Sequence, residues 1–258
     1  MATNPYESPE QPTNLPRQSS FWPKPSFEFL ALLCLLGFLC LLVMPRHFLS
    51  FGSREAARRA SCSNNLHNIA VALRSYESDH HSLPPAYTVD ANGKPLHSWR
   101  TLLLPYLEQK QLYKEIDLAK PWDDPANKPA YDTPLKIYQC PSSVVDRTMT
   151  TYLAVVSPDG CFRPKRCISF DEIKDDRSCT LLVMDASSKH AVHWMSPQDA
   201  SAKTLLNSET DGEFSHPGGA LAAFADGGIR FLTKNIRPES LRAMISIDGH
   251  DDKIATEH

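Results

Sequence analysis

The residues with the clearest chemical potential are His216 and Asp226, which are separated by nine residues. An imidazole and a carboxylate that share a site can act as an acid–base pair or as metal ligands. The intervening sequence favours a simpler explanation, because Pro217-Gly218-Gly219 predicts a turn into a strand and Asp226-Gly227 a turn out of it. We therefore predict that the His216 ring forms a hydrogen bond with a neighbouring loop. Structural rather than catalytic roles are predicted for all five residues of this signature: His216, Gly218, Gly219, Asp226 and Gly227.

Other chemical motifs are missing from the sequence. It has no Gly-rich phosphate loop, no nucleophile elbow and no His-Glu-x-x-His segment. The seven cysteines include no pair with the Cys-x-x-Cys spacing, which disfavours a zinc site. We predict no cofactor, no metal and no enzymatic activity.

A group of aromatic residues suggests a second kind of site. Trp99, Tyr106, Tyr113 and Trp122 lie within one short part of the chain. We expect most of them to form a core between a helix and a sheet. The alternative is a face on which a solute or a carbohydrate stacks, formed by Trp99, Tyr106 and Trp122.

The overall composition excludes one class of partner. The formal net charge is -3, with 41% hydrophobic and 22% charged residues. Because no dominant positive charge is available to neutralise phosphates, we predict that the protein binds no nucleic acid.

The N-terminal region contains the strongest single signal. Residues 1–26 are polar and rich in proline, which predicts a disordered tail. Sixteen uncharged residues then run from Phe29 to Met44. We predict a single transmembrane helix over residues 27–45; a cleavable signal peptide and a buried core helix are the alternatives. The arginines that follow this segment would by themselves keep the C-terminal side in the cytoplasm.

The remaining chain, residues 53–248, is expected to form one α+β domain. Apolar residues at Leu66, Ile69, Ala70 and Leu73 predict a long amphipathic helix that ends near residue 78. A second helix is predicted over 98–107 and a last one over 238–245. Short strands are predicted over 135–140, 151–156, 180–185, 191–195 and 220–225. The last of these pairs with 229–233 through Asp226-Gly227-Gly228. The result is a long helix packed on an antiparallel sheet, followed by a flexible tail over 249–258.

Several motifs in this domain resemble those of a very large bacterial family of pilin-like proteins of unknown function. The family has a prepilin-type N-terminal segment and ends in a His-x9-Asp-Gly signature, which His216 through Gly227 match. Further matches, in the same order as in the family, are Arg54-Glu-Ala-Ala-Arg-Arg59, Cys62-Ser-Asn-Asn-Leu66, Ser98 to Glu108, Pro121-Trp122-Asp123 and Tyr138-Gln-Cys-Pro141.

The resemblance fails at the cleavage site. Family members carry Gly-Phe-Thr-Leu-x-Glu, whereas this chain has Ser26-Phe27-Glu28 with no preceding glycine. We therefore expect a permanently anchored, pseudopilin-like structural or interaction protein rather than a filament subunit. The resemblance implies a single-pass protein of the cell membrane with a cytoplasmic tail and its domain on the extracytoplasmic side. We also expect the long helix to give association in the membrane, with copies of itself or with other pilin-like proteins.

Export would place the cysteines of the domain in an oxidising compartment, where pairing is expected. Five cysteines lie outside the apolar segment, and the preferred pairs are Cys62–Cys140 and Cys161–Cys167, with Cys179 left free. The alternative is that all five stay reduced.

Overall fold

The computed structural model of the chain describes residues 26–163, 166–201 and 214–249, with the side chains of residues 41–51 left out. The chain divides into two units, residues 1–50 and 51–258. The two predicted tails, 1–26 and 249–258, fall almost wholly outside the described residues.

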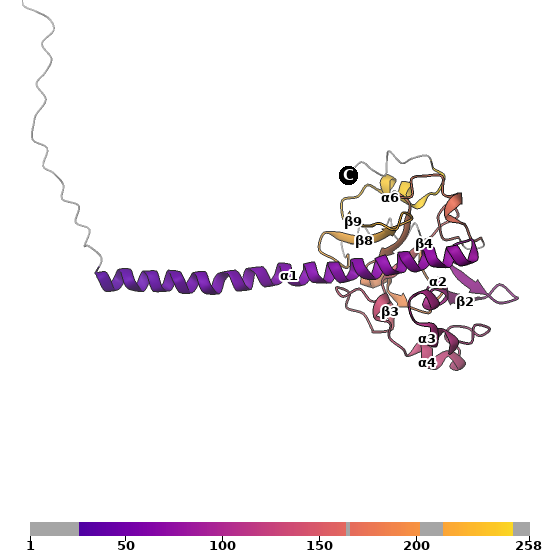
Figure 1. Ribbon diagram of the computed structural model, residues 1–258, viewed down its shortest axis with the longest axis horizontal. Coiled ribbons are helices and arrows are strands. Elements are labelled where there is room, and N and C mark those ends of the chain that lie inside the picture. Colours follow the sequence, from indigo (N-terminus) through magenta and orange to yellow (C-terminus); the bar gives the residue numbers. More distant parts are fainter. Residues whose placement is uncertain (1–25, 164–165, 202–213, 250–258) are drawn as a thin grey trace, which may run out of the picture. The chain divides into compact units, whose positions relative to one another are not determined.

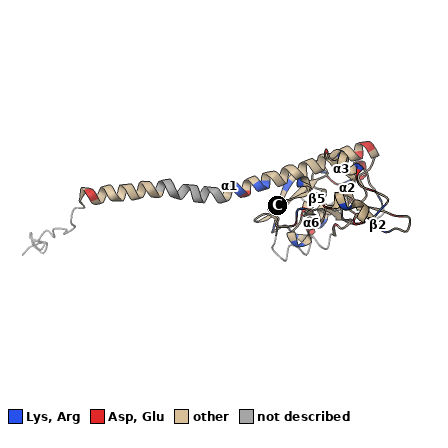
Figure 2. Ribbon diagram, turned by 90° about the horizontal axis from the view of Figure 1, so that it is seen from below, with Lys and Arg blue, Asp and Glu red and all other residues tan. Residues whose placement is uncertain are grey.

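The first unit contributes the beginning of helix α1 (Phe27–His80). Residues 27–40 of this helix include no Lys or Arg, and Glu28 is the acidic residue of the first turn (Figure 2). Large apolar side chains are exposed along it, among them Phe27 at 89% and Leu35 at 67%. The structure thus confirms a helix over residues 27–45. Within the described residues, however, no helix combines the length and the apolar character needed to cross a membrane.

The second unit contains the rest of α1, which packs on the core of the domain. Leu66, Ile69, Ala70 and Leu73 are all completely buried, as the amphipathic pattern predicts. The helix ends at His80, and Pro84-Pro85, which cannot continue a regular helix, follows four residues later.

A five-stranded sheet forms the centre of the domain, in the order β7-β4-β5-β8-β9. Figure 1 labels β4, β8 and β9 of this sheet. Its strands are β4 (Tyr152–Val156), β5 (Leu181–Asp185), β7 (Ala200–Ser201), β8 (Gly219–Phe224) and β9 (Ile229–Thr233). Strand β7 runs parallel to β4, whereas the other pairs are antiparallel. The prediction of an antiparallel sheet is therefore wrong in this detail: the sheet is mixed, because β7 adds a short parallel edge.

Each face of the sheet is covered by a different helix. The side chains of β8 alternate, so that Leu221 and Ala223 join the core beneath α1, while Ala222 and Phe224 join a second core. That second core is completed by helix α6 (Pro238–Ile245), which lies where it was predicted. The sheet is thus buried on both faces.

The β8–β9 hairpin is confirmed, including its turn. Gly227 has a φ of 86°, a left-handed conformation that glycine adopts without a steric penalty. Asp226 accepts a hydrogen bond from the Gly228 amide at 2.7 Å and pairs with Arg230.

Two of the other predicted elements have a different form. The predicted strand at 135–140 is a 3-10 turn, η3 (Lys136–Tyr138), in which buried Leu135 and Tyr138 follow a spacing of three. The predicted helix over 98–107 is broken into α2 (Trp99–Leu102) and η1 (Leu104–Tyr106), where Pro105 interrupts regular hydrogen bonding. The remaining elements are β1 (Tyr87–Val89), β2 (Pro95–Ser98), α3 (Lys110–Lys114), η2 (Pro125–Asn127), α4 (Lys128–Tyr131), β3 (Met149–Thr150), η4 (Phe170–Glu172), η5 (Ser188–His190) and β6 (Val192–His193).

Candidate functional site

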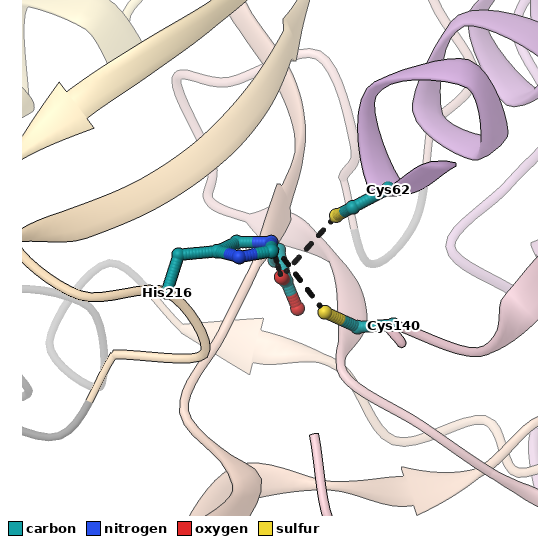
Figure 3. A group of neighbouring side chains, drawn as sticks. Cys62, Cys140 and His216 are labelled. Carbon is teal, nitrogen blue, oxygen red and sulfur yellow. Dashed lines mark hydrogen bonds and ion pairs between the residues drawn. The ribbon is translucent and has the colours of Figure 1, made fainter. Parts of the chain in front are cut away.

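Four buried side chains with chemically active atoms meet inside the domain: Cys62, Cys140, Asp185 and His216. Their ligand atoms all lie within 4.8 Å of one another. The Cys62 sulfur lies 3.4 Å from Asp185 Oδ2, and His216 Nε2 lies 3.6 Å from both that oxygen and the Cys140 sulfur. Figure 3 shows Cys62, Cys140 and His216 directed toward a common centre. We call these four residues the thiol–histidine cluster.

Each member of the cluster comes from a different segment. Cys62 lies on the buried face of α1, one turn before Leu66, and Asp185 is the last residue of β5. Cys140 follows η3, and His216 precedes β8 in an isolated bridge with Gly219. The cluster therefore joins the helix, the centre of the sheet and two loops.

Hydrogen bonds fix the orientation of the histidine and the carboxylate. His216 Nδ1 lies 2.8 Å from Glu55 Oε1, and Arg58 Nε donates to the other oxygen of Glu55 at 2.9 Å. Asp185 Oδ1 accepts from Thr151 at 2.5 Å and from Ser215 at 3.1 Å. As a result His216 Nε2 and Asp185 Oδ2 are the atoms that face the two sulfurs.

Burial and mutual contact shift the acid–base properties of the cluster. A hydrogen bond from Cys62 lowers the pKa of Cys140 to about 3, with a further contribution from His216, and raises the pKa of Cys62. Burial and the charge at Cys140 raise the pKa of Asp185 well above its usual range. Burial alone would lower the pKa of His216, but the hydrogen bonds to Cys140 and Glu55 outweigh it and raise that pKa. The arrangement therefore favours loss of the proton from Cys140 and its retention by His216.

Two kinds of chemistry use such a set of side chains. A thiolate beside a histidine that a carboxylate orients is the arrangement of a cysteine nucleophile. Here, however, Cys140 is only 4% exposed, and its sulfur is surrounded by the other cluster atoms. The same thiols, imidazole and carboxylate are also ligands for a borderline-soft metal ion. A cavity of about 540 Å³ lies beside Cys140, between Asn65, Gln139 and Arg147.

Neither of the two predicted disulfides is present, although the cysteines of one predicted pair, Cys62 and Cys140, are neighbours in space. Every cysteine is a free thiol, including Cys62 and Cys140, which are neighbours in the cluster. Cys161 is buried, whereas Cys167 is exposed, and the two are not bonded to each other. The predicted disulfides are therefore absent from the structure.

The signature residues His216 and Asp226 lie at opposite ends of β8 and do not share a site. Asp226 and Gly227 form the turn that was predicted. Gly218 has a φ of 88° and leads into the strand, which Gly219 begins. The predicted contact of the His216 ring with a neighbouring loop is made to Cys140, and a second contact, to Glu55 of α1, was not predicted.

The aromatic residues pack in or against the core, as was expected for most of them, rather than forming the alternative ring surface. Trp99 is completely buried and donates its indole N–H to Asp199, so it belongs to the core. The Trp122 ring stacks on Tyr131, with centroids 5.7 Å apart, and lies 5.2 Å from the His193 ring. The Tyr106 hydroxyl donates to Asp79. These contacts give no support to carbohydrate binding by this group of residues.

A buried ion pair was not predicted from the sequence. Arg100 and Asp199 lie 2.7 Å apart with side chains 0% and 1% exposed. Arg100 also donates to the carbonyls of four residues, namely Tyr152, Trp194, Ser196 and Gln198. Asp199 accepts further hydrogen bonds from Trp99 and from the Ala154 amide. This network joins α2 to β4 and to the segment before β7.

The fold and the cluster define an α+β domain in which one long helix is fixed to a mixed sheet through buried polar contacts. Residues 53–156 match the family described as "Protein of unknown function (DUF1559)", so this part of the chain is similar to that family. The matched residues include Glu55, Cys62 and Cys140 and end before Asp185 and His216. Comparison with curated proteins found no match, and comparison with solved structures found none either.

Proposed function

We propose that this chain is a membrane-anchored, pseudopilin-like structural or interaction protein without catalytic activity. Its domain would lie on the extracytoplasmic side of the cell membrane. The observation that carries the proposal is the exposed apolar surface at the start of α1, where Leu32, Leu36 and Phe38 are each more than half exposed. Contact of such a surface with water is unfavourable by about 25 cal/mol per Å², so a lipid or apolar protein environment is favoured.

The uncharged segment is slightly shorter than the range of about 17–25 residues that is usual for a transmembrane helix. The uncharged run from Phe29 to Met44 has sixteen residues, which as a helix is about 24 Å long. The hydrocarbon core of a bilayer is about 30 Å thick, and a short helix is accommodated by local thinning of the bilayer or by association with other helices. Association with copies of itself or with other pilin-like proteins would follow from the same surface.

The buried state of the thiol–histidine cluster supports a non-enzymatic role for the domain. A nucleophile must reach its substrate, and none of the four side chains is more than 4% exposed. The loops that surround the sheet would instead provide the contacts with partners.

The anchor is tested by placing two charges in the apolar segment of the full chain. The double variant Leu32→Lys/Leu36→Lys puts both charges on one face of the helix, where each is expected to cost about 2.5–3.5 kcal/mol in a bilayer. We expect the wild-type chain to remain with the membranes after alkaline carbonate extraction and the variant to be lost from them.

A matched control is Ala91→Lys/Gln111→Lys, which adds the same charge at exposed positions of the domain and should leave the chain in the membrane fraction. Recovery of the wild-type chain in the soluble fraction would refute the anchor. Carbonate-resistant attachment of the Leu32→Lys/Leu36→Lys variant would assign attachment to another part of the chain.

A further inference from the structure

We propose that the thiol–histidine cluster is a structural zinc site, in which one ion is bound by Cys62, Cys140, Asp185 and His216. The inference does not rest on the membrane anchor, because all four residues lie in the domain. It assigns to the cluster a ligand that the spacing of the cysteines in the sequence does not suggest.

The geometry is the first argument for zinc. Zinc binds sulfur at about 2.3 Å and nitrogen or oxygen at about 2.0–2.2 Å, so neighbouring ligand atoms of a tetrahedral site are about 3.3–3.8 Å apart. Three of the six distances between the four ligand atoms, 3.4, 3.6 and 3.6 Å, fall in this range, and the other three do not exceed 4.8 Å. Binding of the ion would draw the most widely separated ligand atoms together by about 1 Å, a shift that side-chain rotation can supply.

The surrounding hydrogen bonds are the second argument. A histidine that binds a metal through Nε2 usually donates its Nδ1–H to a carboxylate or carbonyl, which fixes the ring. His216 has this arrangement, with Glu55 Oε1 2.8 Å from Nδ1. Asp185 Oδ1 likewise accepts hydrogen bonds from the hydroxyl groups of Thr151 and Ser215, so Oδ2 is the oxygen that can bind the ion.

Charge and access are the third argument. A carboxylate buried beside two sulfurs is costly when it is ionised, and a divalent cation offsets that cost. Two thiolates favour zinc over calcium or magnesium, which prefer oxygen ligands. Binding transfers the thiol protons, and any proton on Asp185 Oδ2 or His216 Nε2, to solvent, while both sulfurs remain reduced. Of the four ligands, Cys140 also lines a cavity.

The site would hold the domain together at one point. Its ligands come from α1, from the segment after η3, from the end of β5 and from the segment before β8. A structural zinc site of this closed, four-ligand kind contributes directly to folding.

The test begins with metal analysis of the full chain purified in detergent without chelators. We expect about one zinc per chain by inductively coupled plasma mass spectrometry. Cobalt exchanged into the site should give the sulfur-to-cobalt charge-transfer absorption of thiolate ligands together with intense tetrahedral bands. A chain that holds less than about a tenth of an equivalent of any transition metal, and binds none when zinc is added, would overturn the proposal.

Variants separate a metal site from a merely structural turn. Glu55→Gln preserves the size of the side chain that orients His216 and should weaken zinc binding by about 10–100-fold. Asp185→Asn should reduce it further, whereas Cys161→Ser, at a buried thiol outside the cluster, should leave the zinc content unchanged. Equal zinc affinity in wild type and Glu55→Gln would contradict the assigned geometry.

A readout on the wild-type chain covers the case in which the variants do not fold. A chelator should lower the unfolding temperature and expose Cys62 and Cys140 to alkylation, and added zinc should reverse both effects. The purified chain could instead contain a Cys62–Cys140 disulfide, which would lower its mass by that of two hydrogen atoms until the chain is reduced. In that case the cluster is a disulfide site and not a metal site.

Discussion

Replacement of Arg100 with alanine is expected to lower the free energy of unfolding by about 3–5 kcal/mol. The variant would leave the carboxylate of Asp199 buried without its partner at 2.7 Å. It would also leave four backbone carbonyls without the donors that Arg100 provides. The measurement is equilibrium unfolding of the full chain in denaturant.

The matched control is Arg242→Ala, which removes an exposed arginine from α6 and should change the free energy of unfolding by less than about 0.5 kcal/mol. A loss in Arg100→Ala no larger than in this control would show that the buried ion pair is unimportant to the fold.

The cost of the Arg100 variant should also depend on pH. Burial raises the pKa of Asp199, and the contacts with Arg100 act in the opposite direction. Without Arg100 that pKa rises further, and a group with a raised folded-state pKa loses stability as the pH increases. The difference in stability between wild type and Arg100→Ala should therefore be smaller in acidic than in alkaline buffer.

Gly219→Ala is also expected to lower the free energy of unfolding strongly. Overpacking costs roughly 1–3 kcal/mol, and the loss here should lie at or above the upper end of that range. A Cβ at this position would lie 2.0 Å from the carbonyl oxygen of Leu232, which is backbone and cannot turn aside. The strain would fall on the first pair of the β8–β9 hairpin and on the Gly219–His216 bridge. Thermal and chemical unfolding measure the loss, and zinc affinity would report any displacement of His216.

Gly228→Ala serves as the comparison within the same hairpin. A Cβ there would meet the Arg230 guanidinium at 2.8 Å and the Asp226 carboxylate at 2.9 Å, both of which are ends of side chains that can move. Its cost should be clearly smaller than that of Gly219→Ala. Equal losses of unfolding free energy in the two variants would contradict the claim that the close approach of the Leu232 carbonyl excludes a side chain at position 219.

The elements that the sequence predicts well are those with local signals. The buried stripe of α1 follows the helical period, the turn at Asp226-Gly227 marks the last hairpin, and α6 begins at Pro238. Strand β7 has only two residues, which is too short for an alternating pattern. The sheet was therefore predicted without its parallel edge.

The spacing of residues in the sequence could not predict the candidate site. Cys62, Cys140, Asp185 and His216 are far apart in the chain, so no short motif contains two of them. Pairing Cys62 with Cys140 identified two neighbours in space, but the structure has no bond between their sulfurs. Arg100 was missed because arginine is seldom buried, and nothing local reveals a partner 99 residues away.

The most direct test of the proposed function is the accessibility of Cys167 in intact spheroplasts. Its thiol is exposed, whereas Cys62, Cys140 and Cys161 are buried. Because burial of part of the side chain raises the pKa of Cys167, a membrane-impermeant maleimide is best used in mildly alkaline buffer. An extracytoplasmic domain predicts labelling of the full chain before lysis and without reductant, and loss of most of this labelling in Cys167→Ser. Labelling that appears only after lysis would place the domain in the cytoplasm and contradict the proposed function.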